Sequence, residues 1–372
     1  MIQDTVKALL KGIQDPVVVE LGAYDGSDTR WLRESCEGSA PYYIAVEPDA
    51  RHFPGLLTIP GIRAVQVAIA SYTGMAPWYA SSDGLGTGDA SSSIRPPKEH
   101  LLTAPQLRFT LEGEVPCLTL DDLATREGID RIDFLWADIQ GAEKDMVQGG
   151  KNILRRTEWV LVESCFQELY EGQAVRREFL EMVAPDFELI AELPDETVLL
   201  KHKVNTAIPG WMTPEELEWL HSTARTMNSA IEVGCWKGRS THALLSGCRG
   251  AVWAVDHWLG TPSQRSDGHS EANEGRLFQD FFTNVGMFSN LTVVRGESPD
   301  VAARCPAAEM VFLDGDHGYG AVKADLEAWG PKTKRLICGH DIESAEIRRA
   351  VEETFGRFTV PAGQIWAVEV GG

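Results

Sequence analysis

A short pattern occurs twice in this chain, and it constrains the fold more than any other feature. The first copy is PVVVELGAYDGSDTRWL, residues 16–32, and the second is SAIEVGCWKGRSTHALL, residues 229–245. Each copy has a short apolar run, then Glu-x-Gly-x-x-x-Gly, then a polar residue that opens a helical stretch. A strand, a glycine turn and a helix in this order are typical of the start of a βαβ unit. Two copies therefore predict two domains of the same kind.

The same succession of apolar runs follows each copy. A second run ends in an acid at Glu47 in the first copy and at Asp256 in the second, and a third run ends at Asp138 and Asp314. Helical stretches such as DDLATREG and AVKADLEAWG alternate with these runs. This alternation indicates a parallel sheet with crossover helices. The sequence thus predicts two doubly wound, Rossmann-like α/β domains in tandem.

The boundary between the domains is marked by a change in the pattern. ELIAELPDETVLLKHK is typical of a hairpin that closes a domain, and VNTAIPGW is typical of a linker. TPEELEWL, which begins at Thr213, then has the cap, first-turn proline and glutamate of a new helix with a capping box. We expect a first domain over 1–203, a linker over 204–211 and a second domain over 212–372.

Two segments allow more than one interpretation. The Gly/Ser/Pro-rich stretch between Ser71 and Val115 is either a surface loop or a lid over a substrate. The segment 257–282 contains His257, His269 and several aromatic residues. It either lines a pocket for a substrate or is a surface loop that leads into an amphipathic helix.

Charge and composition exclude several classes of function. The net charge of −21 argues against a protein that tracks nucleic-acid phosphates, and it also argues against binding to an anionic membrane. There is no apolar run long enough for a membrane span, and the N-terminal residues are typical of a short amphipathic helix. The seven cysteines form no CxxC pair, which favours reduced thiols and a cytoplasmic location. A homo-oligomer is compatible with these features.

The glycine turns indicate the kind of ligand. A dinucleotide turn has the form G-x-G-x-x-G, which neither copy shows, and the glutamate before the first glycine would repel a pyrophosphate. A carboxylate at this place suits a ligand with an ammonium and a sulfonium group. The acids Glu47 and Asp256 are placed to accept hydrogen bonds from ribose hydroxyls. S-adenosylmethionine is the ligand that this pattern favours, with a dinucleotide or an unliganded turn as alternatives.

Residues 16–200 resemble the FkbM-type methyltransferases. The matching pieces are VVVELGAYDGSDT, YIAVEPDA, VQVAIAS, TLDDLA, IDFLWADIQGAEKDMVQGG and WVLVES. DIQGAE is the most specific piece, with Gln140 where the family often has Glu, and GAYDG departs from the Asn-x-Gly that usually follows Gly-Ala. The resemblance implies that Asp138 borders the reaction centre. It also implies a set of cofactor-binding residues: Glu20, Gly22, Gly26 and Glu47.

Residues 209–372 resemble the class I methyltransferases grouped around the macrocin-type sugar O-methyltransferases. The matching pieces are IEVGCWKGRST, VWAVDHWLGT, VVRGESPD, MVFLDGDHGYGAVKADLEAW and LICGHDI. Together the two resemblances imply tandem class I methyltransferase domains. The second implies these residues around the cofactor: Glu232, Gly234, Gly238, Asp256, Ser298 and Asp314.

Polar residues at two strand ends of the second domain indicate a metal site. Asp314 ends one apolar run, and KRLICGHDI ends the next with His340 and Asp341. Adjacent parallel strands end side by side, so these groups can meet, and the matching acids of the macrocin-type relatives hold a divalent metal. Carboxylates suit Mg²⁺, whereas the imidazole of His340 makes the site softer and leaves Mn²⁺ or no metal open. A hydrogen-bonded histidine at a strand end is the simpler alternative for His340.

A base for the acceptor hydroxyl is expected beside this site. Methyl transfer needs an aligned oxygen nucleophile that loses its proton. Asp316 and His317 are placed for that role, with Asp316 favoured by the resemblance and His317 as the second candidate. Both could instead cap the helix that starts at Tyr319.

The sequence as a whole predicts a tandem S-adenosylmethionine-dependent O-methyltransferase. Its acceptor is expected to be a small molecule or glycan, with the methyl group going to a hydroxyl of a sugar, a glycan or a secondary metabolite. One alternative is that one half, more readily the first because of GAYDG, is a non-catalytic binding or scaffolding domain. Another is that the fold serves a different reaction, such as hydroxylation.

Overall fold

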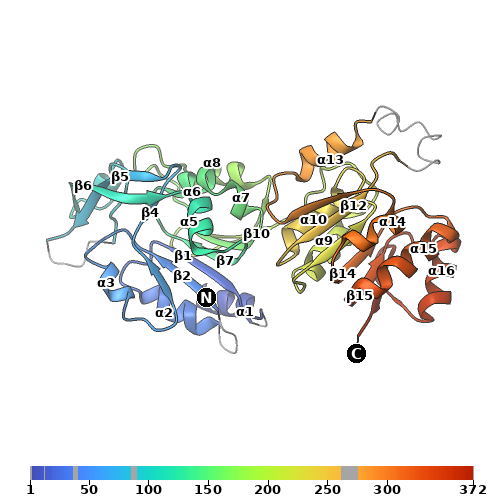
Figure 1. Ribbon diagram of the computed structural model, residues 1–372. Helices are drawn as coiled ribbons and strands as arrows, with labels where there is room; N and C mark the ends of the chain where they lie inside the picture. The colour runs from blue at the N-terminus through green and yellow to red at the C-terminus, as the bar shows by residue number, and fades with distance from the viewer. Residues whose placement is uncertain (1, 12, 37–40, 85–89, 261–274, 372) are drawn as a thin grey trace. The chain divides into compact units, whose positions relative to one another are not determined.

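The chain folds into two compact units, Met1–Lys203 and Val204–Gly372. The computed structural model describes residues 2–11, 13–36, 41–84, 90–260 and 275–371 (Figure 1). Each unit is an α/β domain built on one seven-stranded sheet. Over the described ranges, no helix is both long and apolar enough to cross a membrane.

The first unit contains a mostly parallel sheet. Its strands are β1 (Val17–Leu21), β2 (Tyr42–Val46), β3 (Arg63–Val65), β7 (Ile132–Ala137), β8 (Thr157–Glu163), β9 (Phe187–Glu192) and β10 (Thr197–His202). Its helices are α1 (Ile2–Leu10), α2 (Ser27–Ser35), α3 (Phe53–Leu56), α4 (His100–Thr103), α5 (Leu120–Glu127), α6 (Glu143–Gly149), α7 (Lys151–Leu154) and α8 (Arg176–Val183). The strand order is β3-β2-β1-β7-β8-β10-β9, and the β9–β10 hairpin closes the sheet in antiparallel fashion, as the sequence predicts.

The second unit repeats this topology. Its strands are β11 (Ala230–Val233), β12 (Val252–Asp256), β13 (Leu291–Arg295), β14 (Ala308–Leu313), β15 (Thr333–Gly339), β16 (Thr359–Ala362) and β17 (Ile365–Glu369). Its helices are α9 (Pro214–Ala224), α10 (Arg239–Gly247), α13 (Leu277–Val285), α14 (Ser298–Val301), α15 (Tyr319–Trp329) and α16 (Ala345–Phe355). The strand order β13-β12-β11-β14-β15-β17-β16 matches the first sheet position by position. The prediction of two doubly wound domains is therefore confirmed.

Helices cover both faces of each sheet because successive strand residues point to opposite sides. On β1, Val18 packs in a cluster with Val6 of α1 and Leu32 of α2, whereas Val19 packs in a separate cluster with Leu123 of α5. The second sheet likewise separates two apolar clusters. Burial on both faces explains why the strands read as continuous apolar runs.

The strand order fixes where a ligand can bind. The chain runs outward from β1 through β2 to β3 and then returns to β7 on the other side of β1, and β11 and β14 show the same reversal. In an open parallel sheet, such a reversal opens a crevice at the carboxyl ends of the two central strands. Each unit therefore has one such crevice.

The stretch between Ser71 and Val115 differs from the simpler expectation. It contains β5 (Gly74–Ser82) and most of β6 (Arg108–Leu118), which pair with each other and, through β6, with β4 (Ala68–Ile69) in a small three-stranded sheet. The prediction of a surface loop is wrong over these strands. Small residues and prolines suggested a loop, but β5 and β6 are stabilised by their mutual pairing, which sequence composition does not register.

Helix α9 begins with the capping box that the sequence predicts. Thr213 accepts a hydrogen bond from the backbone N–H of Glu216, and the Glu216 carboxylate accepts one from the backbone N–H of Thr213. This capping box, with Pro214 in the first turn, starts α9.

Candidate functional site

The two glycine turns have the same backbone geometry. Gly22 has φ of +83° and Gly234 has φ of +86°. A Cβ on Gly22 would lie 1.8 Å from the carbonyl oxygen of Asp138, and one on Gly234 would lie 2.1 Å from that of Asp314. Only glycine fits, because each turn crosses the end of the neighbouring central strand at backbone contact distance. The crossing brings the turn to the strand-end acid in both domains.

The second glycine of each pattern has a different role. Gly26 and Gly238 are the N-cap residues of α2 and α10, with φ of +80° and +89°. Neither is among the residues that line the cavity of its own domain, and a Cβ on either would approach apolar side chains. These two predicted cofactor-binding residues thus shape the helix start.

The glutamate of each pattern is buried beneath the turn. Glu20 accepts hydrogen bonds from the hydroxyls of Thr29 at 2.6 Å and Tyr43 at 2.7 Å, and Glu232 accepts one from Thr241. Burial raises the pKa of Glu20 to about 8 and that of Glu232 to about 7. Neither side chain lines the cavity beside it. The structure therefore places them as supports of the turn, whereas the sequence suggested direct ligand contact.

The acid after the second strand does line the cavity in each domain. Glu47 accepts hydrogen bonds from the backbone N–H groups of Tyr24 at 2.8 Å and Asp49 at 2.7 Å. Asp256 accepts them from Cys235 at 2.8 Å and Trp236 at 3.0 Å, and also from Trp258. Each carboxylate holds its glycine turn and keeps further acceptor capacity, which is what a ribose diol requires.

Each turn also carries an aromatic residue with a left-handed backbone, which the sequence did not single out. Tyr24 has φ of +46° and Trp236 has φ of +47°. Both line their cavities; the Tyr24 ring lies 4.2 Å from that of His52, and the Trp236 ring lies 5.4 Å from that of Trp211. The equal backbone geometry shows that the two turns correspond residue by residue.

The cavities differ in size. The N-terminal cavity has a volume of about 250 Å³ and the C-terminal one about 1240 Å³. Trp78 of β5 and Ser93 form part of the N-terminal wall, so the small three-stranded sheet borders this site. The linker residues Gly210 and Trp211 form part of the C-terminal wall. The C-terminal cavity is large enough for a nucleoside cofactor together with an acceptor.

In the N-terminal domain, Asp138 lies at the cavity wall at the end of β7. The side-chain amide nitrogen of Gln140 donates to Asp138 Oδ1 at 2.6 Å and to Glu163 Oε2 at 3.1 Å. Burial raises the pKa of Asp138 above its ordinary value. The sequence identified Asp138 but missed Glu163, because only the pairing of β7 with β8 brings the two acids together.

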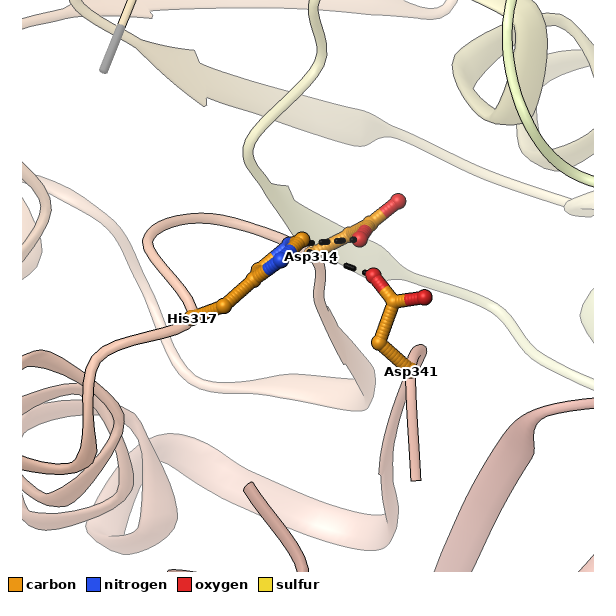
Figure 2. A group of neighbouring side chains, drawn as sticks. All are labelled: Asp314, His317 and Asp341. Atoms are coloured by element: carbon orange, nitrogen blue, oxygen red, sulfur yellow. Dashed lines mark ion pairs between the residues drawn. The ribbon is translucent and has the colours of Figure 1, made fainter. Parts of the chain in front are cut away.

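In the C-terminal domain, three side chains converge at the ends of β14 and β15 (Figure 2). Asp314, His317 and Asp341 each offer a donor atom within 4.8 Å of the others. His317 Nε2 lies 3.2 Å from Asp341 Oδ2 and 3.9 Å from Asp314 Oδ1. Burial raises the pKa of Asp314 to about 6. Asp314 and Asp341 of the predicted metal donors belong to this group, its third member is His317, and the predicted donor His340 lies beside the two acids.

His340 is turned toward the protein interior. Its Nε2 lies 3.2 Å from Glu216 Oε1, and its Nδ1 lies 3.3 Å from Asp341 Oδ1. Burial alone lowers the pKa of His340, but hydrogen bonding to Asp341 and the charges of Asp314, Asp341 and Glu216 outweigh it and raise the pKa to about 9. The same Nδ1 lies 3.9 Å from Asp314 Oδ1, so His340 connects Glu216 with the two strand-end acids and is placed to orient Asp341.

The remaining predicted residues lie at the wall of the C-terminal cavity. Asp316 is exposed, and its Oδ1 accepts a hydrogen bond from the backbone N–H of Gly318 at 2.8 Å, just before α15. The Ser298 hydroxyl donates to Asp325 and accepts from Trp329 Nε1 at 2.8 Å. Within the expected acceptor segment, His257 lines the cavity, whereas His269 lies outside the described residues.

Comparison with known proteins agrees with this geometry. Residues 20–196 match the FkbM methyltransferase domain, and residues 231–342 match a methyltransferase domain. The 2-O-methyltransferase NoeI of Sinorhizobium fredii (strain NBRC 101917 / NGR234) is 37% identical over 192 residues, which cover 48% of this chain and 75% of the relative.

Solved methyltransferase structures are also similar. The O-methyltransferase from Bacillus cereus in complex with SAH is 17% identical, with a TM-score of 0.31 and coverage of 44% of this chain and 84% of the other. TomG from Streptomyces achromogenes, in complex with SAM, is 14% identical, with a TM-score of 0.31 and coverage of 45% and 84%.

The paired turns, the strand-end acids and the two family matches lead to one conclusion. The cofactor of such domains is S-adenosylmethionine, and each half of the chain has the crevice and the acids that suit it. The chain belongs to the FkbM family of S-adenosylmethionine-dependent O-methyltransferases and carries a second methyltransferase domain in tandem.

Proposed function

We propose that the N-terminal domain transfers a methyl group from S-adenosylmethionine to a hydroxyl of a sugar, either free or in a glycan or secondary metabolite. The observation that carries this proposal is Asp138, a strand-end carboxylate at the cavity wall beside the Gly22 turn. The likeness of the chain to a 2-O-methyltransferase supports a hydroxyl acceptor.

For this reaction the N-terminal domain has to place the cofactor and the acceptor and to remove the proton of the acceptor hydroxyl. Gly22, Glu47 and Asp138 line the same cavity. In our proposal Gly22 and Glu47 face the cofactor, and Asp138 faces the acceptor. An acceptor hydroxyl in hydrogen-bond contact with Asp138 can pass its proton to that carboxylate as the oxygen takes the methyl group. Alignment of the oxygen with the methyl carbon supplies the rest of the rate gain.

We propose that the C-terminal domain is a second O-methyltransferase that uses a divalent cation. The donors fit: two carboxylates and one imidazole converge within 4.8 Å, and they come from the β14 and β15 ends. Asp314, His317 and Asp341 would hold the ion, and this mixture of oxygen and nitrogen donors suits Mn²⁺ or Mg²⁺. Such an ion lowers the pKa of a hydroxyl that binds it.

Asp316 is our candidate base in this domain. It lines the cavity two residues after Asp314, and its exposed carboxylate is available to an acceptor, because only its Oδ1 accepts a backbone hydrogen bond in the Asx turn before α15. His317 is engaged with Asp341 and Asp314, which suits it better as a metal donor than as a base. Asp316 thus removes the hydroxyl proton while Asp314, His317 and Asp341 orient the oxygen.

One experiment tests both proposals. The full chain is incubated with S-adenosylmethionine and a panel of monosaccharides, nucleotide sugars and oligosaccharides, S-adenosylhomocysteine is quantified, and the methyl position is located by NMR. Asp138→Asn should remove one product and Asp316→Asn the other. If no acceptor that carries sugar hydroxyls yields S-adenosylhomocysteine above the background, the sugar proposal is wrong. If chelation of divalent ions leaves both products unchanged, the metal proposal is wrong.

A further inference from the structure

Two acids meet behind the wall of the N-terminal cavity. Asp138 follows β7 and Glu163 ends β8, and these parallel neighbours end at the same edge of the sheet. The side-chain amide nitrogen of Gln140 lies 2.6 Å from Asp138 Oδ1 and 3.1 Å from Glu163 Oε2, so the two carboxyl groups meet at one nitrogen atom. Two ionised carboxylates this close repel each other, and a proton on either one relieves that repulsion. Asp138 is among the residues that line the cavity, and Glu163 is not, so Asp138 is the acid of the pair that faces the cavity.

Gln140 holds this pair in place. Its amide nitrogen has two N–H groups, and one is directed to each acid, at 2.6 Å to Asp138 and 3.1 Å to Glu163. Its amide oxygen lies 2.7 Å from the hydroxyl of the buried Tyr170. Gly141 then passes under the Tyr170 ring, where a Cβ would lie 2.8 Å from a ring carbon. Gln140 and Gly141 of the DIQGAE sequence thus hold Asp138 and Glu163 in fixed positions.

The surroundings favour a proton on this pair. Burial is the largest cause that raises the pKa of both acids, and the charge of the neighbouring Asp138 raises the pKa of Glu163 further. Further acids act on the pair and raise its pKa values: Asp28 on Asp138, and Glu143 and Glu196 on Glu163. Two largely buried carboxyls that accept from the same amide nitrogen interact strongly and titrate as one unit.

We propose that Asp138 and Glu163 hold one proton between them in the free protein, release it when the cationic cofactor binds, and regain it from the acceptor hydroxyl during methyl transfer. The proposal rests on the proposed function of the N-terminal domain. A positive sulfonium beside Asp138 favours the ionised forms of both acids. S-adenosylhomocysteine has a neutral thioether instead, so it gives no such stabilisation.

The proton and the charge balance over the cycle. Asp138 accepts the hydroxyl proton as the acceptor oxygen forms its bond to the methyl carbon and the carbon–sulfur electron pair returns to sulfur. The positive charge at sulfur is then gone, and the pair again holds one proton. Asp138 is the catalytic residue, because it touches the acceptor. Glu163 is a positioning residue that acts through Asp138.

Calorimetry tests this inference without an acceptor. The full chain is titrated with S-adenosylmethionine and, separately, with S-adenosylhomocysteine at pH 7 in buffers of different ionisation enthalpy, which gives the protons released on binding. We expect S-adenosylmethionine to release up to about one proton more from the wild type than from Glu163→Gln. With S-adenosylhomocysteine, the two proteins should differ little. Glu188→Gln, an exposed glutamate on β9, is the matched control and should behave as the wild type.

The outcomes distinguish the shared-proton hypothesis from the proposed function of the N-terminal domain. If wild type and Glu163→Gln bind S-adenosylmethionine with the same proton release, the shared proton is ruled out while the proposed function stands. If the N-terminal site binds no S-adenosylmethionine, the proposed function itself fails. Should Glu163→Gln not fold, Asp138→Asn removes the other half of the pair and must show the same loss of proton release.

Discussion

The Nε2 atom of His340 lies 3.2 Å from Oε1 of Glu216, a residue 124 positions earlier in the chain. Glu216 also closes the capping box of α9 and accepts a hydrogen bond from the backbone N–H of Gln364 at 2.7 Å. A Cβ on Gly363 would lie 2.2 Å from the same oxygen, so this turn packs directly on Glu216. One buried carboxylate therefore joins the start of the domain, its last hairpin and the end of β15.

Glu216→Gln should destabilise the C-terminal domain by about 1–3 kcal/mol, because it weakens several hydrogen bonds to a buried charged group. Urea denaturation followed by tryptophan fluorescence gives the change in free energy of unfolding. Glu215→Gln, at an exposed position on the same helix turn, is the control and should change it far less. Equal effects of the two substitutions would contradict the central place of Glu216.

Glu20 should make stability depend on pH. Burial raises its pKa from an ordinary value of 4.5 to about 8, so between these values the folded chain keeps a proton that the unfolded chain has released. Stability must then fall as the pH rises through this window. Glu20→Gln cannot ionise and should lose less in Tm than the wild type over the same range. The proposed proton is absent if the two Tm profiles run parallel.

Mn²⁺ should bind to the C-terminal domain through Asp341. Asp341→Asn should weaken binding by about tenfold or more, because a charged donor becomes a neutral amide. The amplitude of the free Mn²⁺ signal in electron paramagnetic resonance measures this. Glu352→Gln changes an acid on α16 away from the three donors and should leave the affinity as it is. An unchanged affinity in Asp341→Asn would remove this residue from the site.

Arg239 should hold the linker against the C-terminal domain. Its guanidinium donates to the carbonyl oxygens of Thr206 at 2.7 Å, Ile208 at 2.6 Å and Met212 at 3.0 Å. Arg239→Met removes all three bonds, so chymotrypsin should cleave after Trp211 several-fold faster. Arg348→Met, on the exposed face of α16, serves as the control. A cleavage rate equal to that of the control would show that the linker is held by other contacts.

The fold and the glycine turns could be predicted from the sequence because they depend on local patterns. Each of these patterns can be recognised in a short segment of the sequence: the apolar runs, their alternation with helices and the Glu-x-Gly-x-x-x-Gly turns. Glycine at positions 22 and 234 could be expected as well, because each turn crosses the end of a neighbouring strand with no room for a side chain. The pairing of strands then places Asp138 and Asp314 at equivalent points.

What could not be predicted depends on side-chain direction and on long-range contacts. The sequence indicated His340 as a metal donor, and its Nδ1 does lie near Asp314 and Asp341, but the contact of its Nε2 with Glu216 joins residues 124 positions apart and has no local signal. Glu20 has the residue type for a ligand contact, but Thr29 and Tyr43 bury it. Glu163 carries no local signal of its own, because its partner is 25 residues away on the next strand.

The central claim is that both halves bind S-adenosylmethionine, each at its own glycine turn. Isothermal titration of the full chain measures the number of molecules bound, and circular dichroism verifies the fold of each variant. We predict two molecules bound by the wild type, and one each by Gly22→Ala and Gly234→Ala, because the added Cβ collides with the facing strand-end carbonyl. A single molecule bound by the wild type, or full binding by either variant, would contradict the account.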